Sequence, residues 1–287
     1  MTAHCSGDCA AALLWFWLLW CFLAGVRLSF VQGLLRRITI IGPSMAPALY
    51  GRHFAVVCAD CGFQFSCDAD HVPPDHQAAC PNCGFIHNSL TEAKELPPDR
   101  VFIDSWQPFF RRFRRSSVVA LEAPGDSADL AVKRIALLPG ERLIIRDGDL
   151  YDGQRLIRKS LAEFHALRLL VHDNAYQPHL TAGLPSRWKP RDGNARWQFA
   201  ATGVQIEPAT APSTGFDWLE YEHWPCTAEV RSRGVNSPIT DNDSYNQAET
   251  HRALNAVHDV LLTCQLRCQW NRQFGLRRDG WLAAVRS

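Results

Sequence analysis

Two Cys-x-x-Cys motifs constrain this chain more than any other feature, and they lie at Cys58–Cys61 and Cys80–Cys83. A glycine and a phenylalanine follow each pair, and glycine allows the backbone to turn tightly enough for an amide to reach a cysteine sulfur. This spacing is typical of a zinc ribbon, in which four thiolates form a closed tetrahedral site. The sequence therefore predicts a structural Zn²⁺ bound by Cys58, Cys61, Cys80 and Cys83, with no open position for a catalytic water.

Two disulfides or a free redox pair are the alternatives for these motifs. The chain has 11 cysteines, and the others are scattered, so their number and spacing do not indicate a disulfide framework or a redox compartment. Cys67 is predicted to be a cysteine that does not bind the metal. His71, His76 and His87 are alternative ligands, although each is more typical of a loop.

An apolar segment near the N-terminus predicts a transmembrane anchor over residues 10–33, preceded by a tail over residues 1–9. Every residue from Ala10 to Val26 is apolar or glycine, which is about the shortest run that crosses a bilayer as a helix. A cleaved signal peptide is the competing interpretation. The preceding residues lack Lys and Arg, and no small-x-small cleavage site follows, so we favour an uncleaved anchor.

The arginines around this segment bear on orientation and on partners. Arg27, Arg36 and Arg37 follow it, which by the positive-inside rule favours a cytoplasmic C-terminal part. Residues 106–115 mix aromatic rings with arginines, as expected for contact with anionic lipid or with single-stranded nucleic acid; a solvated basic loop is the plain alternative. A predicted anchor lies nearby, and the net charge of only +1 gives no argument for nucleic acid, so we predict a lipid bilayer as the partner and no nucleic acid.

Ser44 and Lys133 are the candidate catalytic residues. Ser44 stands among the glycine and prolines of residues 42–47, which stiffen the backbone and present its hydroxyl, although such a serine often marks only a turn. Lys133 lies in an apolar stretch, residues 130–138, that ends in a Pro-Gly turn. Strand alternation places Lys133 on one face with apolar residues such as Ile135, and burial there would favour the neutral amine. An exposed edge lysine is the alternative.

Together these two stretches resemble the type I signal peptidases, which are membrane-bound Ser-Lys proteases. Gly42 to Leu49 reads Gly-Pro-Ser-Met-Ala-Pro-Ala-Leu, against a family serine box of roughly Gly-x-Ser-Met-x-Pro-Thr-Leu. Lys133 to Glu141 reads Lys-Arg-Ile-Ala-Leu-Leu-Pro-Gly-Glu and is similar to the family's lysine box, apart from a glycine that is usual before the Pro-Gly. The resemblance extends from Ala11 to Leu156 and contains one insertion.

The resemblance implies a membrane-anchored endopeptidase that removes signal peptides from exported preproteins. In it Ser44 is the nucleophile, Lys133 is the general base, and the catalytic domain is extracytoplasmic. The Ser44 amide supplies one oxyanion donor, and Gly42 stands where some members carry a second donor. Residues 236–246 faintly resemble the family's last box, in which Asp241 or Ser244 would orient Lys133.

The resemblance and the residue pattern together predict a mainly β chain with an antiparallel signal-peptidase-like fold. The catalytic core would comprise residues 34–57 and 96–160, and the zinc-ribbon insert residues 58–95. Residues 161–287 would form an aromatic β-rich region that contains the last box. Within it, alternation predicts a strand over His258–Trp270. No finishing element follows that strand in the pattern, so we expect this region to be incomplete.

Two other functions are compatible with parts of this pattern. A catalytically inactive membrane adaptor would use the zinc ribbon to bind proteins, in agreement with the degraded last box and the arginine distribution. A self-cleaving Ser-Lys repressor would be soluble and would carry a helical DNA-binding domain, for which the sequence shows no segment.

Overall fold

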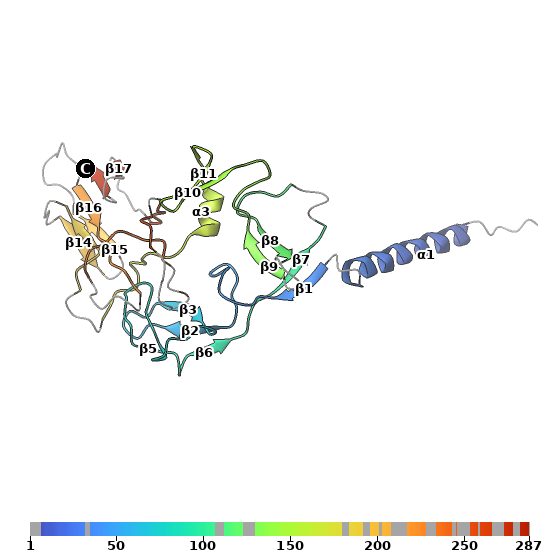
Figure 1. Cartoon of the computed structure of the whole chain (residues 1–287), viewed down its shortest axis with the longest axis horizontal. Coiled ribbons are helices and arrows are strands. Elements are labelled where there is room, and N and C mark those ends of the chain that lie inside the picture. The colour runs from blue at the N-terminus through green and yellow to red at the C-terminus, as the bar shows by residue number, and fades with distance from the viewer. Residues whose placement is uncertain are drawn as a thin grey trace, which may run out of the picture.

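The structure is a computed structural model in which antiparallel β strands follow one N-terminal helix. Figure 1 shows this helix, α1, extending away from the strands, with β1 beside its inner end and β14 to β17 at the far side. The mainly antiparallel β class is therefore confirmed. The structure describes residues 7–31, 35–106, 112–122, 130–179, 184–191, 196–200, 203–207, 217–227, 234–242, 245, 253–257, 259–265, 273–277 and 282–286.

The N-terminal helix α1 spans Gly7–Val26 and continues as a π-helix over Arg27–Val31. The stretch Ala11–Ser29 is long and apolar enough to cross a membrane, and 0% of it is buried inside the protein. Large apolar side chains that the rest of the chain does not cover need an apolar environment elsewhere. The helix therefore has the character of a membrane anchor or of a signal sequence.

Two short antiparallel pairs carry the chain from the helix to the candidate catalytic residues. β1 (Leu35–Thr39) pairs with β7 (Arg100–Asp104), and β8 (Val118–Glu122) pairs with β9 (Leu130–Arg134). In the second pair Val119 lies opposite Lys133. β9 ends at Arg134 and is therefore shorter than the strand predicted over residues 130–138.

The segment between β1 and β7 folds as a small β unit of its own. β2 (His53–Val57) is the central strand between β3 (Gln64–Asp68) and β6 (Lys94–Leu96), and β4 (Gln77–Ala78) pairs with β5 (Asn88–Ser89). Because β2 and β6 belong to this sheet, the insert begins before Cys58 and ends after residue 95. Its core contains the buried residues Val56, Cys67, Ala78 and Leu90.

A β meander follows β9. β10 (Leu143–Arg146), β11 (Asp149–Asp152) and β12 (Arg155–Leu156) are antiparallel neighbours. The turn between β10 and β11 has positive φ at both Asp147 and Gly148, at 51° and 82°, which is the backbone of a tight hairpin. Helix α3 (Leu161–Leu167) comes next and begins with a capping box between Ser160 and Glu163.

The C-terminal region contains a four-stranded antiparallel sheet in the order β13 (Trp188–Pro190), β16 (Asp217–Tyr221), β18 (Leu282–Arg286), β17 (Gln273–Arg277). β14 (Trp197–Ala200) and β15 (Gly203–Ile206) form a separate pair. The strand predicted over His258–Trp270 is wrong where the structure describes it, because residues 259–265 have no regular structure. β17 and β18 are strands of this sheet that sequence alternation did not reveal.

Candidate functional site

Ser44 lies in a tight turn that points its hydroxyl outward. Gly42 has a φ of +80°, a conformation that suits glycine. The Ala46 N–H donates to the Pro43 carbonyl at 3.0 Å, and the Leu49 N–H donates to the Met45 carbonyl at 3.0 Å. Met45 is buried, whereas Ser44 beside it is exposed. The turn is therefore anchored by the methionine and presents the serine to solvent.

Asp99 holds both ends of this loop. The Ile40 N–H donates to the Asp99 carbonyl at 2.9 Å. The Tyr50 N–H donates to the Asp99 carboxylate at 2.8 Å, and the Asp99 N–H donates to the Tyr50 carbonyl at 2.9 Å. Gly51 packs so closely on Gly42 that an added Cβ would lie 3.0 Å from the Gly42 N and O atoms. The loop therefore closes on itself, which fixes the position from which Ser44 is presented.

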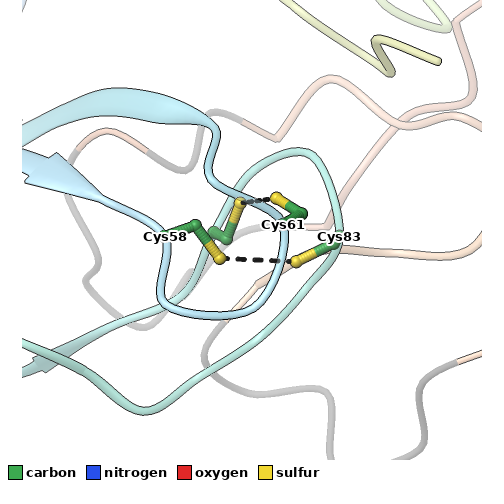
Figure 2. Close-up of side chains that lie close together, drawn as sticks. Cys58, Cys61 and Cys83 are labelled. Atoms are coloured by element: carbon green, nitrogen blue, oxygen red, sulfur yellow. Dashed lines mark hydrogen bonds between the residues drawn. The ribbon is translucent and has the colours of Figure 1, made fainter. Parts of the chain in front are cut away.

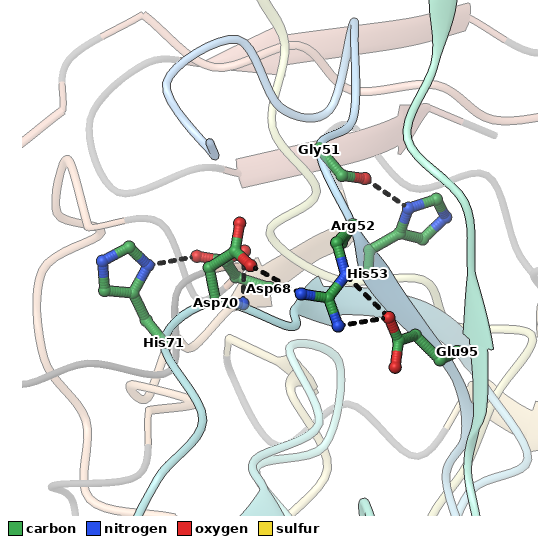
Figure 3. A network of polar contacts seen from close by, with 7 residues as sticks. All are labelled: Gly51, Arg52, His53, Asp68, Asp70, His71 and Glu95. Carbon is green, nitrogen blue, oxygen red and sulfur yellow. Dashed lines mark hydrogen bonds and ion pairs between the residues drawn. The ribbon is translucent and has the colours of Figure 1, made fainter. Parts of the chain in front are cut away.

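A polar network ties the end of this loop to the insert (Figure 3). His53 donates from Nδ1 to the Gly51 carbonyl at 2.9 Å, because a carbonyl oxygen only accepts. Arg52 donates from Nε to Glu95 at 2.8 Å and also pairs with Asp70 at 3.4 Å. β2 and β6 are thus joined through side chains as well as through the backbone.

The structure brings Lys133 to Ser44. Lys133 Nζ donates a hydrogen bond to Ser44 Oγ at 2.7 Å, although 89 residues separate the two in the sequence. The expected burial of Lys133 is wrong, because its side chain is exposed. Alternation predicts which face of a strand a residue occupies, but β9 pairs with β8 alone, and a two-stranded sheet leaves that face open to solvent.

The predicted supporting residues have different positions. The Ser44 N–H has no hydrogen-bond partner within the described residues, so it is available as an oxyanion donor. Asp241 is not brought to Lys133: its carboxylate accepts from the Asn255 backbone N–H at 2.9 Å and from Asn255 Nδ2 at 3.1 Å. Ser244 lies outside the described residues.

Sequence reasoning missed two acidic residues that shape this site. Asp99 is one, and its only signal in the sequence is its place directly before β7. Glu141 is the other: its carboxylate accepts the Leu138 N–H at 2.7 Å and pairs with Arg115, which lies before β8. This contact fixes the Pro-Gly turn after β9, where Gly140 has the expected positive φ of 90°.

The four predicted metal ligands form one cluster (Figure 2). Cys58, Cys61, Cys80 and Cys83 are all buried, and their Sγ atoms lie within 4.8 Å of one another. The Cys58–Cys83 Sγ distance is 3.6 Å, and the Cys61–Cys80 distance is 3.7 Å. A tetrahedral ion with bonds of about 2.3 Å requires sulfur separations of about 3.8 Å. The cluster therefore has the dimensions of a four-thiolate metal site.

The backbone around the cluster forms two equivalent knuckles. In the first, the Cys58 N–H donates to the Phe63 carbonyl and the Gly62 N–H donates to the Cys58 carbonyl, both at 2.9 Å. Cys80 and Gly84 repeat this pattern in the second knuckle. The two glycines have φ values of 74° and 73°, a conformation that suits glycine. Their N–H groups donate to the carbonyl oxygens of Cys58 and Cys80, whereas the sequence predicted an amide that reaches a cysteine sulfur.

The thiols of the cluster perturb one another. Hydrogen bonds from neighbouring thiols, that of Cys61 first, lower the pKa of Cys58, whereas hydrogen bonds from Cys58 and its neighbours raise the pKa of Cys80. The four sulfurs therefore compete for the same protons. A divalent cation that replaced them would relieve this conflict, because thiolates are the ligands that it binds.

The remaining cysteine and the histidines of the insert lie outside this cluster. Cys67 is fully buried in the apolar core of the insert, and this burial raises its pKa to about 12. The His71 ring pairs with Asp68, and His87 bonds to Gln77 at 2.8 Å. His76 lies in a turn with a φ of 52°. Among the described residues, the sulfur cluster therefore consists of the four knuckle cysteines.

No known protein family, curated protein or solved structure matches this chain. The class of site that the described residues define is a serine–lysine pair on an antiparallel β frame, with a closed four-cysteine cluster on the insert between the two.

Proposed function

We propose that this protein is a membrane-anchored serine endopeptidase of the signal-peptidase type, which removes leader peptides from exported preproteins. The observation that supports this best is the 2.7 Å contact between Lys133 Nζ and Ser44 Oγ. Ser44 and Lys133 come from two motifs that resemble one protease family. They meet although most of the chain between them forms the separate β unit of the insert. A turn serine and an edge lysine without a joint role have no physical reason to meet in this way.

In this mechanism Ser44 attacks the scissile carbonyl while Lys133 accepts its proton. The bond between Ser44 Oγ and the carbonyl carbon forms, and the oxyanion receives a hydrogen bond from the Ser44 N–H. Lys133 then gives the proton to the leaving amine, and a water molecule, activated by the neutral lysine, hydrolyses the acyl-enzyme. Lys133 must be neutral to begin, so a substrate that covers the exposed pair and excludes water would favour the reaction.

The N-terminal helix supports the proposed substrate class. Only a short segment separates its end at Val31 from Ser44, so the nucleophile stays near the bilayer surface. A leader peptide presents its cleavage site just beyond its own apolar helix, which is also close to the bilayer surface. We place the catalytic part on the extracytoplasmic side, where exported preproteins emerge. Arg27, Arg36 and Arg37 are an exception to the positive-inside rule in this arrangement.

We further propose that the four-cysteine cluster binds a structural Zn²⁺. All four coordination positions would be filled by thiolates, so the ion would supply folding energy and no activated water. The insert contributes no residue to the Ser44–Lys133 contact. The insert is connected to the Ser44 loop where Tyr50 and Asp99 hydrogen-bond to each other, and we call this pair the stem.

The peptidase assignment is tested with full-length protein in detergent and a preprotein substrate. We expect Ser44→Ala and Lys133→Ala each to lower the cleavage rate by roughly 10⁴-fold or more. Residues that act as one catalytic unit have non-additive effects, so the loss of either residue removes most of the rate enhancement. Matched controls are Ser89→Ala and Lys94→Ala, which change exposed residues of the insert. Full activity in either catalytic variant would refute the assignment.

The exposure of Lys133 favours one second candidate, a catalytically inactive membrane adaptor. An amine that is open to solvent can donate a hydrogen bond to Ser44 without acting as a base. Wild-type protein that cleaves no preprotein, but captures a partner protein only when zinc is bound, would favour this adaptor.

A further inference from the structure

Two polar residues that lie between the predicted metal ligands, Asp60 and Asn82, are buried against a downstream segment, residues 172–179, which we call the strap. Asn82 stands between Cys80 and Cys83 and has 0% of its surface exposed. Its Oδ1 accepts the Asp173 N–H at 2.7 Å. Its Nδ2 donates to the Asp173 carbonyl at 3.2 Å and to the Tyr176 carbonyl at 2.9 Å. One knuckle side chain thus binds three backbone groups of the strap.

The first knuckle holds the other end of the strap. Asp60 stands between Cys58 and Cys61 and is 2% exposed. The His179 N–H donates to the Asp60 carboxylate at 2.8 Å and to its carbonyl at 3.2 Å. Between these ends the Tyr176 ring packs edge-on against Phe63, with 5.1 Å between ring centroids. Both knuckles therefore contribute to one continuous contact.

Arg187 extends this contact to the C-terminal sheet. It lies directly before β13 and is 4% exposed. Its Nη2 donates to the Asn82 carbonyl at 3.3 Å and to Cys226 Sγ at 3.0 Å. The guanidinium lies over the Trp224 ring, 3.8 Å from its centroid. A buried cation needs such partners, and the Asn82 carbonyl is the one that the second knuckle supplies.

These contacts depend on the shape of the knuckles, and the shape of a knuckle depends on its metal. In small thiolate sites the free energy of metal binding is folding free energy, since the bare cysteines do not hold the turn. Asp60 and Asn82 each lie between two ligands and would move with them. Loss of the ion would leave buried polar groups of the strap without partners, which favours release of the strap into water.

We propose that metal occupancy of the cysteine cluster controls the docking of the strap and of Arg187 on the insert. The metal-loaded ribbon is the docking platform for the C-terminal region, and its knuckle face is occupied by the protein's own chain. This inference rests on the metal binding proposed above and is independent of the peptidase activity. It predicts that metal removal undocks the strap and exposes Arg187.

Limited trypsin digestion of the full chain in detergent tests the proposal. Arg168 is exposed and serves as an internal control, whereas Arg187 is buried and should be cut only after undocking. Lys189 precedes Pro190 and resists trypsin. We expect chelation to raise the rate of cleavage after Arg187 by at least about tenfold, with little change at Arg168, and added Zn²⁺ to restore protection. Continued protection of Arg187 in metal-free protein would overturn the proposal.

Two variants separate docking from metal binding, with zinc content measured in parallel. Asn82→Ala and Tyr176→Ala should keep one zinc per chain and yet be cut after Arg187 as fast as the metal-free protein. Ala59→Ser changes an exposed residue of the first knuckle and should behave as wild type. If Asn82→Ala loses zinc, the Tyr176→Ala variant becomes the test of docking, because Tyr176 lies on the strap and not between the metal ligands.

Full protection of Arg187 in zinc-loaded Tyr176→Ala would contradict the proposal. Purified wild-type protein that binds no zinc would refute this proposal and the structural-zinc proposal together. The absence of zinc would leave preprotein cleavage unaffected, so failure of the docking proposal can be distinguished from failure of the peptidase proposal.

Discussion

Asp99 and Tyr50 bind each other at the point where the loop carrying Ser44 closes. The Tyr50 N–H donates to the Asp99 carboxylate at 2.8 Å, and the Asp99 N–H donates to the Tyr50 carbonyl at 2.9 Å. This pair fixes one end of the loop, while the Asp99 carbonyl fixes the other end at Ile40. Both residues therefore help to determine where the serine stands.

Asp99→Ala should therefore lower kcat more than it raises KM. Removing the carboxylate leaves the Tyr50 N–H unpaired and loosens the loop, and we expect a loss of roughly tenfold in kcat and about 1–2 kcal/mol in stability. Asp99→Asn keeps an acceptor oxygen and should remain close to wild type. Steady-state kinetics on a preprotein, with thermal unfolding in parallel, checks this. An Asp99→Ala protein with wild-type kcat would show that the clamp does not position Ser44.

Lys133→Arg tests the proton-transfer role. Arginine keeps the positive charge and the ability to donate to Ser44, but it does not lose its proton in proteins. We expect preprotein cleavage to fall by about 10³-fold or more, with an unchanged unfolding temperature. If the arginine variant cleaved at the wild-type rate, the lysine would serve only to hold the serine hydroxyl.

The cysteines can be sorted by zinc stoichiometry. We expect one zinc per chain in wild-type protein and loss of metal with several kcal/mol of stability in Cys80→Ser, since metal binding contributes to folding. Cys67→Ser is the matched control: Cys67 is equally buried but lies in the apolar core, so this variant should keep zinc and lose about 1–3 kcal/mol. Elemental analysis and thermal unfolding provide both readouts. Zinc retained at full stoichiometry in Cys80→Ser would contradict the ligand assignment.

Stability should fall as the pH is lowered from about 6.5 to about 4, because two histidines of the C-terminal region resist protonation. Burial, followed by the nearby Arg187 charge, lowers the pKa of His172 to about 4. The same two causes, burial first, lower the pKa of His223 to about 4. Below its ordinary pKa of about 6.5 each histidine binds a proton in the unfolded chain but not in the folded chain. This contribution to stability is therefore present above about pH 6.5 and is lost as the pH falls through about 4.

Thermal unfolding at about pH 7, 5.5 and 4.5 measures this dependence on the two histidines. His223→Gln should reduce the loss on acidification, whereas His87→Gln, which changes an exposed histidine, should not. An equal acid sensitivity in both variants would assign the effect to other groups.

The local motifs were the part of the molecule that the sequence predicted well. The two Cys-x-x-Cys pairs carry their own turn geometry, so the cluster follows from residues that are near neighbours. The Pro139–Gly140 turn is local in the same sense. The meeting of Ser44 with Lys133 is not local, and it was expected only because two separate motifs resemble one family.

The parts that were missed depend on contacts between distant residues. The exposure of Lys133 depends on what covers β9, and strand alternation does not contain that information. Alternation also failed to separate strands β17 and β18 from the irregular residues 259–265. Pairing with β16 decides which segment becomes a strand, and this pairing is a contact between distant residues. The clamp at Asp99 and the strap on Asn82 join residues that no motif connects.

The stem at Tyr50 and Asp99 also has a consequence for how this protein tolerates change. Since the insert leaves and rejoins the catalytic frame at a single point, its length adds nothing to the span that Ser44 and Lys133 must bridge. Loops of the insert that do not contact the strap can therefore lengthen or shorten without moving either residue. The knuckles do not share this freedom, because Asp60 and Asn82 bind the strap.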